Sequence, residues 1–408
     1  MNKTHKTPPP ADSPAVAERL LCDRISIIAT ETLDLADAAG RVLAQPLLAD
    51  RPSPAIDVSV MDGFAVRLAD VSSAPIRVMG DSVIGHAPAI FPATGCLRIV
   101  TGAPLPPGAD CVVRREDVSE ADGAVRILPD AIPNIKPGIN VRRRGENALD
   151  GALVVESGSV VTPAVAGALA SCGAVSVLVF RRVRIGVLTT GDEVLPPSQF
   201  PEPWQLRDSN GAALAALCST NPMVEAVQSG HAPDDPAQLR AAAAALLESC
   251  DALFLTGGVS MGHRDFVPSV LADLGVQPLF HKVPQRPGRP LLGAVSRRGQ
   301  PVLALPGNPV SVLATARRIG VPVLQHLAGA KPQPRPRVQL CNPDHKALDL
   351  WWHRLVRLTA AGCAELVDNR GSGDIFGASR SDGFVEVPPG AAAGEGVAGA
   401  LEFFAWNW

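Results

Sequence analysis

Residues 181–330 show the clearest hydrophobic pattern of the chain: short apolar runs alternate with stretches whose apolar residues recur at helical spacing. The apolar runs predict buried strands, and the longer stretches predict helices. The predicted strands are residues 183–189, 223–227, 252–256 and 302–305, and the predicted helices are residues 210–218, 236–249, 266–274 and 309–326. Strands that alternate with helices of this length predict a doubly wound α/β domain with a parallel sheet.

The pattern before residue 181 changes twice. Residues 15–28 and 33–48 have apolar spacing that predicts two helices, the second interrupted at Gly40. Short alternating runs then lie between Gly, Pro and Asp turns, at residues 64–67, 76–79, 97–100, 111–114 and 124–128. These runs predict a β-rich domain (residues 55–140) inserted into a discontinuous helical region (residues 15–54 and 141–180).

The last part of the chain begins with the proline-rich stretch 331–336, which predicts an extended spacer. Residues 337–408 are again short apolar runs between turns, and they predict a small C-terminal β-barrel domain. The expected fold class is therefore multidomain, α/β plus β.

Composition narrows the classes of protein. In 408 residues, 46% are hydrophobic and 19% are charged, which excludes wholesale disorder. The net charge of −3 argues against a dedicated nucleic-acid binder. Residues 157–180 carry no charge, but Ser, Thr, Pro and Gly occur throughout, so we expect a short helix at 163–171 and a strand rather than a membrane span.

The N-terminal residues and the cysteines together predict a cytoplasmic protein. Residues 1–14 are polar and proline-rich, so we expect neither a signal peptide nor an anchor. The eight cysteines show no C-x-x-C pair and no nearby histidine at zinc spacing. We expect them to be small buried side chains in a reducing compartment.

Polar residues and glycines follow the ends of the predicted parallel strands. They are Thr190, Asp192 and Glu193 after the first strand, Gly257, Gly258, Ser260 and Asp265 after the third, and Pro306, Gly307 and Asn308 after the last. Because such strand ends meet at one sheet edge, we expect a ligand site there. Glycines expose backbone N–H groups to anions, and carboxylates suit Mg²⁺ bound to phosphate oxygens. Each loop alone is equally compatible with an ordinary turn.

Two arginines lie in the proline-stiffened turn Gln285-Arg-Pro-Gly-Arg-Pro290. A guanidinium is always charged and binds oxyanions bidentately, so Arg286 and Arg289 are candidate anion ligands. The alternative is a solvated basic turn. Asp62 lies in a Gly turn of the β-rich domain, and alone would be unremarkable. His281 and His353 have no second ligand at metal spacing, so we expect structural histidines.

Eight motifs, in one order along the chain, resemble those of the molybdopterin molybdenumtransferases, the family that includes the MoeA type and the E domain of gephyrin. They are Ser59-Val-Met-Asp-Gly-Phe-Ala-Val66, Thr101-Gly-Ala-Pro104, Arg143-Arg-Gly-Glu146, Thr190-Gly-Asp-Glu193, Asp208-Ser-Asn210, Gly257-Gly-Val-Ser260, Arg286-Pro-Gly-Arg-Pro290 and Leu305-Pro-Gly-Asn-Pro309. Each is weak alone, and together they are specific.

The resemblance implies a homodimer with its active site between subunits, which inserts molybdate into adenylylated molybdopterin with Mg²⁺-dependent release of AMP. By matching positions it implies functional roles for Asp62, Thr101, Glu193 and Asp265, an anion-binding turn at Arg286, Arg289 and Pro290, and, more loosely, roles for Arg354 and Ser372. We assign Glu193 and Asp265 to the metal and the activated water, the two arginines to oxyanions, and the glycine loop, with Asp208 nearby, to the pterin end of the substrate.

Two other functions stay open on the sequence. A non-catalytic paralogue that binds or carries the finished cofactor is suggested by Arg289, where the family has lysine, and by Pro268. A molybdopterin adenylyltransferase would share the α/β domain but lack the β-rich insertion and the barrel. The sequence does not distinguish molybdate from tungstate as the oxyanion that is inserted. The resemblance also suggests the adenylyltransferase, a molybdoenzyme or its maturation factor as protein partners.

Overall fold

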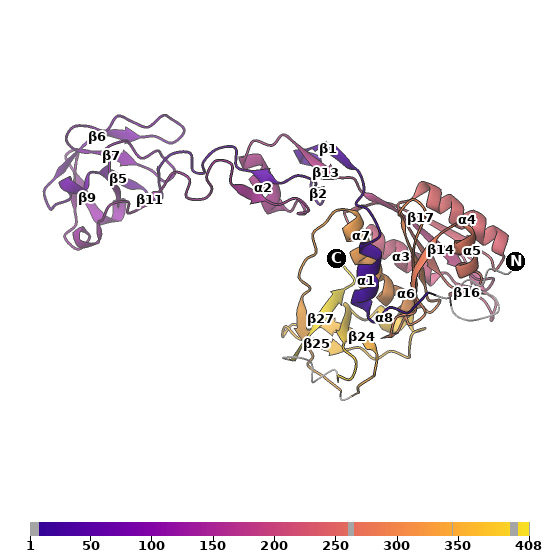
Figure 1. The fold of residues 1–408 in the computed structure, drawn as a ribbon. Coiled ribbons are helices and arrows are strands. Elements are labelled where there is room, and N and C mark those ends of the chain that lie inside the picture. The colour runs from indigo at the N-terminus through magenta and orange to yellow at the C-terminus, as the bar shows by residue number, and fades with distance from the viewer. Residues whose placement is uncertain (1–7, 260–264, 345, 392–398, 408) are drawn as a thin grey trace. The chain divides into compact units, whose positions relative to one another are not determined.

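The described part of the chain forms two compact units (Figure 1). The structure is a computed structural model, and it describes residues 8–259, 265–344, 346–391 and 399–407. Unit 1 comprises Met1–Ala44, Gly158–Pro163 and Ser176–Trp408, and unit 2 comprises Gln45–Ser157 and Ala164–Val175. The boundaries of the four predicted regions, which would subdivide these two units, remain predictions.

Unit 1 contains a mixed sheet with the strand order β17-β14-β18-β22-β21-β19. The bounds are β14 Val183–Thr190, β17 Val224–Ala232, β18 Ala252–Thr256, β19 Gln277–His281, β21 Leu292–Val295 and β22 Pro301–Leu305. The pairs from β17 to β22 are parallel, as predicted. β19 and β21 pair antiparallel and were not predicted, so the expectation of an all-parallel sheet was wrong at this edge.

Helices cover both faces of this sheet, which makes the α/β part doubly wound. In β18, Phe254 belongs to one buried core, whereas Leu253 and Leu255 belong to another, because successive strand residues point to opposite faces. The first core takes residues from α1, α3 and α7, and the second from α4 and α5. The helix bounds are α3 Ser209–Ser219, α4 Pro236–Ser249, α5 Val267–Asp273, α6 Pro309–Thr315, the π-helix η5 Ala316–Gly320 and α7 Val321–Leu327.

The N-terminal segment differs most from expectation. The first helix, α1, spans Pro14–Cys22 rather than residues 15–28. The β-branched Ile25, Ile27 and Ile28 that follow favour extended structure. The helix predicted at 33–48 is wrong: β1 (Thr30–Asp34) and β2 (Val42–Leu43) pair with β13 (Ser176–Phe180) instead. Pairing with a distant strand has overridden the local helical spacing.

A second sheet forms the C-terminal part of unit 1, with the strand order β20-β24-β26-β27-β23 and β25 beside β24. The bounds are β20 Gln285–Arg286, β23 Arg337–Gln339, β24 Trp351–Leu358, β25 Ala364–Leu366, β26 Gly383–Val387 and β27 Ala400–Ala405. The short helix α8 (Ile375–Ala378) precedes β26. Two residues of the α/β part, in β20, are thus hydrogen-bonded into this sheet.

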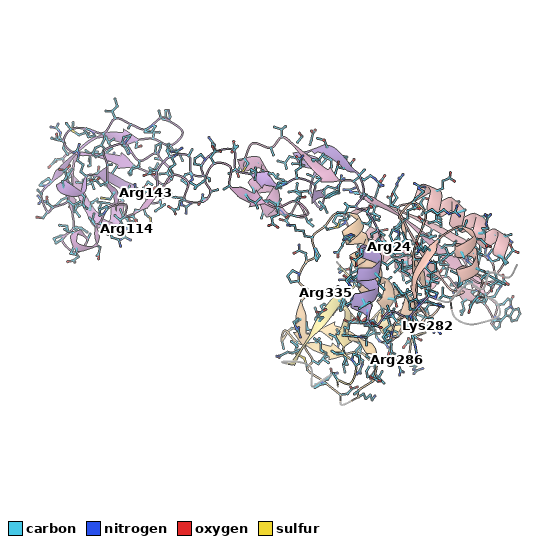
Figure 2. All side chains as sticks on the ribbon, in the orientation of Figure 1. Arg24, Arg114, Arg143, Lys282, Arg286 and Arg335 are labelled. Atoms are coloured by element: carbon cyan, nitrogen blue, oxygen red, sulfur yellow. A yellow bond between two sulfur atoms is a disulfide. The ribbon has the colours of Figure 1, made fainter. Side chains whose placement is uncertain are left out.

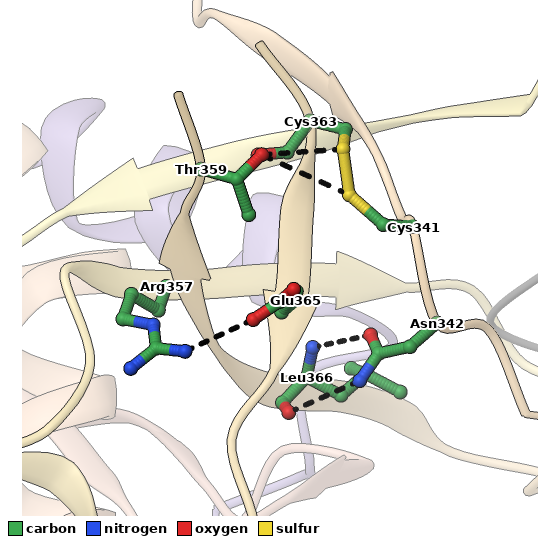
Figure 3. The surroundings of a disulfide bond; sticks show 7 residues. All are labelled: Cys341, Asn342, Arg357, Thr359, Cys363, Glu365 and Leu366. Atoms are coloured by element: carbon green, nitrogen blue, oxygen red, sulfur yellow. Dashed lines mark hydrogen bonds and ion pairs between the residues drawn. A yellow bond between two sulfur atoms is a disulfide. The ribbon is translucent and has the colours of Figure 1, made fainter. Parts of the chain in front are cut away.

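The expectation that all cysteines are reduced was wrong for one pair. Cys341 and Cys363 form a disulfide at the start of β25, with the Thr359 hydroxyl beside both sulfurs (Figure 3). Two residues separated by 22 positions carry no spacing signal that would identify a pair. The other six are free, and burial raises the pKa of Cys218 to about 12, which keeps that thiol unreactive.

We expect reduction of this disulfide to lower the free energy of unfolding by about 3 kcal/mol, because the bond closes a loop of this length in the unfolded chain. The measurement is urea unfolding with and without a dithiol reductant. Cys22→Ser, which touches no disulfide, is the control and should leave the effect of reductant unchanged. Alkylation of the denatured, unreduced protein that labels eight thiols instead of six would contradict the assignment.

Unit 2 contains the β-rich insertion, and the strands predicted there are present. Its main sheet has the order β8-β5-β7-β6-β10-β9. The bounds are β5 Gly63–Val66, β6 Ile76–Ser82, β7 Cys96–Ile99, β8 Cys111–Arg114, β9 Val118–Ala121 and β10 Ala124–Ile127. Short ladders pair β3 (Leu47–Leu48) with β12 (Leu153–Val155) and β4 (Val58–Ser59) with β11 (Val141–Arg142). α2 spans Pro163–Ser171, as predicted.

No helix in the described ranges is both long enough and apolar enough to cross a membrane. The uncharged segment 157–180 divides instead into α2 and β13, as its Pro and Gly content predicted.

Candidate functional site

The loops after β14, β18 and β22 meet at the carboxyl edge of the unit 1 sheet. The Thr190 hydroxyl donates to the Thr256 carbonyl at 3.1 Å, and a Cβ on Gly257 would lie 2.6 Å from that hydroxyl oxygen. The Gly257 N–H donates to the Leu305 carbonyl at 3.3 Å. A Cβ on Gly307 would lie 3.9 Å from the Gly257 Cα. Glycine is therefore required at position 257, where φ is +89 and a side chain would collide with Thr190.

The two carboxylates of the loop after β14, Asp192 and Glu193, have different surroundings. Asp192 accepts a hydrogen bond from the Asp234 N–H at 3.0 Å, which ties the loop to the start of α4. Glu193 is exposed, and its carboxylate lies over Gly191, where a Cβ would be only 2.6 Å from Oε2. Gly191 has φ +130 and no side chain, and so leaves the space that the Glu193 carboxylate occupies.

Of two further residues predicted for the loop after β18, the structure describes Asp265 but not Ser260. Asp265 is half-buried and directly precedes Phe266, the N-cap of α5. Ser260 lies outside the described residues, so its role stays a prediction. Gly258 has φ +62, and a Cβ there would meet Val267 of α5 at 2.9 Å, which shows how closely the loop approaches that helix.

Asp208 and Asn210 connect the start of α3 to this edge. Asp208 accepts from the Gly211 N–H at 2.8 Å as the N-cap and from the Thr189 hydroxyl at 3.1 Å. Asn210 donates to the Gly307 carbonyl at 2.8 Å, and its Oδ1 is buried without a partner among the described residues. Asn210 is thus a site residue that the sequence indicates only through the Asp208-Ser-Asn210 motif. Pro306 and Asn308 flank Gly307, and Asn308 is the N-cap of α6.

The arginine turn is held from beneath by buried polar side chains. Arg286 and Arg289 are exposed, and Arg286 is labelled in Figure 2. Gln285 is 1% exposed and donates through Nε2 to the Gly288 carbonyl at 2.9 Å and to the Thr315 hydroxyl at 3.2 Å. The Val283 N–H donates to the Arg289 carbonyl at 3.1 Å. The turn is thus preorganised, with its guanidiniums facing solvent.

Gly288→Ala should displace this turn. Gly288 has φ +96, and a Cβ would lie 2.2 Å from the Thr315 hydroxyl oxygen. We expect a loss of about 2–4 kcal/mol in unfolding free energy, from backbone strain together with overpacking. Gly299→Ala is the matched control, because Gly299 has φ +79 and open space around it, and should lose only about 1 kcal/mol. Equal losses in urea unfolding would show that the contact with Thr315 is unimportant.

The loosely matched C-terminal residues lie next to the same edge. Arg354 makes two hydrogen bonds of 2.9 Å to the Asp344 carboxylate. The Ser372 carbonyl accepts from the Val310 N–H in the first turn of α6 at 2.9 Å. The Ser372 loop therefore contacts the helix that follows the Leu305–Pro309 loop.

In unit 2 the structure brings Asp62 and Thr101 together. Asp62 Oδ1 accepts from the Thr101 N–H at 2.7 Å and from its hydroxyl at 2.9 Å. Hydrogen bonds from the backbone and then the side chain of Thr101 lower the pKa of Asp62, so this exposed carboxyl is ionised at neutral pH. Asp57 accepts a hydrogen bond from Arg143 Nη1 at 2.6 Å, and the Arg143 N–H donates to the Glu146 carboxylate at 2.9 Å, which closes a turn over the Arg143-Arg-Gly-Glu146 motif; Arg143 is labelled in Figure 2.

The described residues form no preassembled metal cage: no group of three or more His, Cys, Asp or Glu side chains is placed to hold an ion. Two hollows of about 400 and 390 Å³ lie in unit 2, and neither is lined by Asp62 or Thr101.

Two family models and several known proteins match this chain. Residues 13–173 match the model of the MoeA N-terminal region (domain I and II), and residues 186–326 match that of a probable molybdopterin binding domain. The molybdopterin molybdenumtransferase of Synechococcus elongatus is 38% identical over 76% of this chain and 79% of its own length. That of Synechocystis is 31% identical over 92% and 95%. The solved molybdopterin biosynthesis moea protein of Pyrococcus horikosii is 27% identical, with a TM-score of 0.74 over 97% and 99% of the two chains.

Proposed function

Since the chain belongs to the molybdopterin molybdenumtransferase family, we propose that it inserts molybdate into adenylylated molybdopterin and releases AMP. It is a transferase of molybdenum cofactor biosynthesis. The observation that carries the finer proposal is the sheet edge of unit 1, where glycine loops, the Glu193 carboxylate and the Arg286–Arg289 turn all follow strand ends.

The residues at this edge suit both substrates, molybdate and adenylylated molybdopterin. Molybdate is a dianion, and the pterin carries a phosphate linked to AMP, so both need cations and backbone donors. We assign Arg286 and Arg289 to bind the oxyanions. The Gly258 N–H of the loop after β18 donates to phosphate, and Gly257, whose own N–H already donates to the Leu305 carbonyl, leaves room for the ligand to approach. The unpaired Asn210 Oδ1 accepts a hydrogen bond from the bound substrate.

Glu193 and Asp265 are the proposed Mg²⁺ ligands. Mg²⁺ prefers one or two carboxylates and completes its shell with water and phosphate oxygens, so an exposed carboxylate held over Gly191 fits it without a protein cage. When bound, the ion would polarise the phosphoryl oxygens and lower the pKa of a bound water. The chain itself orients that water and the phosphate by holding the two carboxylates on adjacent strand ends.

The test is AMP release from adenylylated molybdopterin by the full-length protein, with Mg²⁺ and with or without molybdate. Release that molybdate stimulates and that a chelator stops reversibly is the expected result. Tight binding of finished cofactor without release, under conditions where a known transferase works, would favour the carrier function suggested by Arg289. ATP-dependent adenylyl transfer would indicate the adenylyltransferase instead.

We further propose a homodimer in which unit 2 of one subunit supplies Asp62 and Thr101 to the site of its partner. Met61 and Val100 next to this pair, and Ile84 beside Gly102, are exposed apolar residues, as expected of a surface that a second copy covers. Mixing an Asp62→Asn subunit with a Glu193→Gln subunit should restore up to about a quarter of the activity, because some mixed dimers keep one intact site. No restoration would contradict shared sites.

The finer arrangement follows the same proposal: a discontinuous N-terminal region, a β-rich insertion, the α/β domain and a C-terminal β-barrel. We place the enzyme in the cytoplasm, where its substrates are made, and expect contact with an adenylyltransferase or a recipient molybdoenzyme. The Cys341–Cys363 disulfide is unusual for that compartment, so its state in cells is a direct check on this placement.

A further inference from the structure

Trp352, the second residue of β24, lies beside two guanidiniums that come from different parts of unit 1. The centre of the Arg354 guanidinium is 4.1 Å from the Trp352 ring centroid, and that of Arg286 is 6.0 Å. Both are within the range in which a cation is attracted to an aromatic face. Arg354 comes from the same strand as Trp352, whereas Arg286 comes from the anion turn of the α/β part.

The backbone fixes this arrangement. β20 pairs in parallel with β24 so that Arg286 lies opposite Trp352. The Trp351 N–H also donates to the Pro284 carbonyl at 2.9 Å, which locks the strand to the start of the turn. The second guanidinium is held by Asp344 through two hydrogen bonds of 2.9 Å. Two groups of like charge, which repel each other, are thus held on one half-buried aromatic side chain.

We infer that Trp352 is a positioning residue for the oxyanion: its ring sets where the guanidiniums of Arg286 and Arg354 stand, and so sets the affinity for molybdate. This inference rests on the proposed function for the identity of the anion. Trp352 touches neither substrate by this account and acts through the two arginines. Removing the ring face while keeping an apolar side chain frees the Arg286 guanidinium and takes one support from Arg354, which Asp344 still holds, and so weakens anion binding without changing the carboxylates that act on the phosphate.

A purely structural role must be separated from this one, because Trp352 also packs against the C-terminal core that contains Val356 and Val387. Trp352→Phe keeps an aromatic face, whereas Trp352→Leu keeps only apolar bulk. Trp351→Leu is a control on the same strand, since adjacent strand residues point to opposite faces. A packing role predicts that all these variants lose stability and activity together.

The experiment measures the dissociation constant of sodium molybdate by calorimetry, and AMP release against molybdate concentration, for the full-length wild type and each variant. For Trp352→Leu we expect the molybdate dissociation constant and KM to rise about tenfold, with kcat at saturating molybdate changed by less than about twofold. Trp352→Phe and Trp351→Leu should both stay within about threefold of wild type in all constants.

Unchanged molybdate affinity in Trp352→Leu would overturn the inference, as would equal weakening in Trp352→Phe or Trp351→Leu. Wild-type protein that binds molybdate but releases no AMP would refute the proposed function alone, and the dissociation constants would still decide the role of Trp352. If the wild type binds no molybdate by itself, the KM values decide. Wild-type protein that neither binds molybdate nor releases AMP would overturn both.

Discussion

Asp265→Asn is expected to slow AMP release on the order of 100- to 1,000-fold while the protein stays folded. A metal ion that stabilises phosphoryl charge contributes several kcal/mol to the transition state, and each 1.36 kcal/mol is tenfold in rate. Asparagine keeps the size of the side chain at the half-buried position before α5 but removes its charge. The slower AMP release should therefore come from weaker Mg²⁺ binding and from poorer activation of the water.

A Mg²⁺ titration of the rate separates this role from simple structural damage. Asp265→Asn should need a higher Mg²⁺ concentration for half-maximal release, and Glu193→Gln should behave in the same way. Asp273→Asn is the matched control, because Asp273 is an exposed carboxylate at the other end of α5. Full activity in Asp265→Asn, or the same loss in Asp273→Asn, would remove the metal assignment.

The loops of the candidate site were predictable from the sequence because their signals are local. Gly257 and Gly258 adopt φ +89 and +62, which few other residues tolerate, so a glycine pair after an apolar run predicts where the strand ends in a turn. Asp208, directly before α3, caps this helix through its side chain, as an Asp at such a position favours. Alternating strands and helices then place these loops at one sheet edge without any knowledge of long-range contacts.

The structural features that the sequence could not predict depend on pairing between distant segments. Arg318 is 2% exposed and meets Glu386, which lies 68 positions later, through two hydrogen bonds. Trp352 and Arg286 meet only because β20 joins the C-terminal sheet. The strands β1 and β2 were mistaken for helix for the same reason, since only β13 reveals their partner. Local spacing carries no information on such partners.

Glu386→Gln is expected to lower the free energy of unfolding by about 3 kcal/mol, because it removes one of the two carboxylates that pair with the buried Arg318 guanidinium. Glu386 also accepts from His353 Nε2 at 3.1 Å, and Arg318 contacts Glu18 of α1 at 2.7 Å. The ion-pair network therefore joins α1, η5 and the C-terminal sheet. Glu402→Gln is the control: its pair with Arg335 is partly exposed and should contribute less than about 1 kcal/mol. Equal losses in urea unfolding would contradict a special role for burial.

The same carboxylate makes the stability depend on acidity in a defined window. Burial alone would raise the pKa of Glu386, but the hydrogen bond from His353 and the charge of Arg318 outweigh it and lower the pKa from 4.5 to about 2. A lowered pKa stabilises the folded state above the unfolded value, and this stability is lost as the pH falls through the folded value. Between pH 4.5 and 2 the wild type should therefore lose about 3 kcal/mol more than Glu386→Gln, which has no carboxyl to protonate there. Urea unfolding at several pH values across this window tests the sign as well as the size, since parallel curves for the two proteins would mean that Glu386 titrates normally in the folded state.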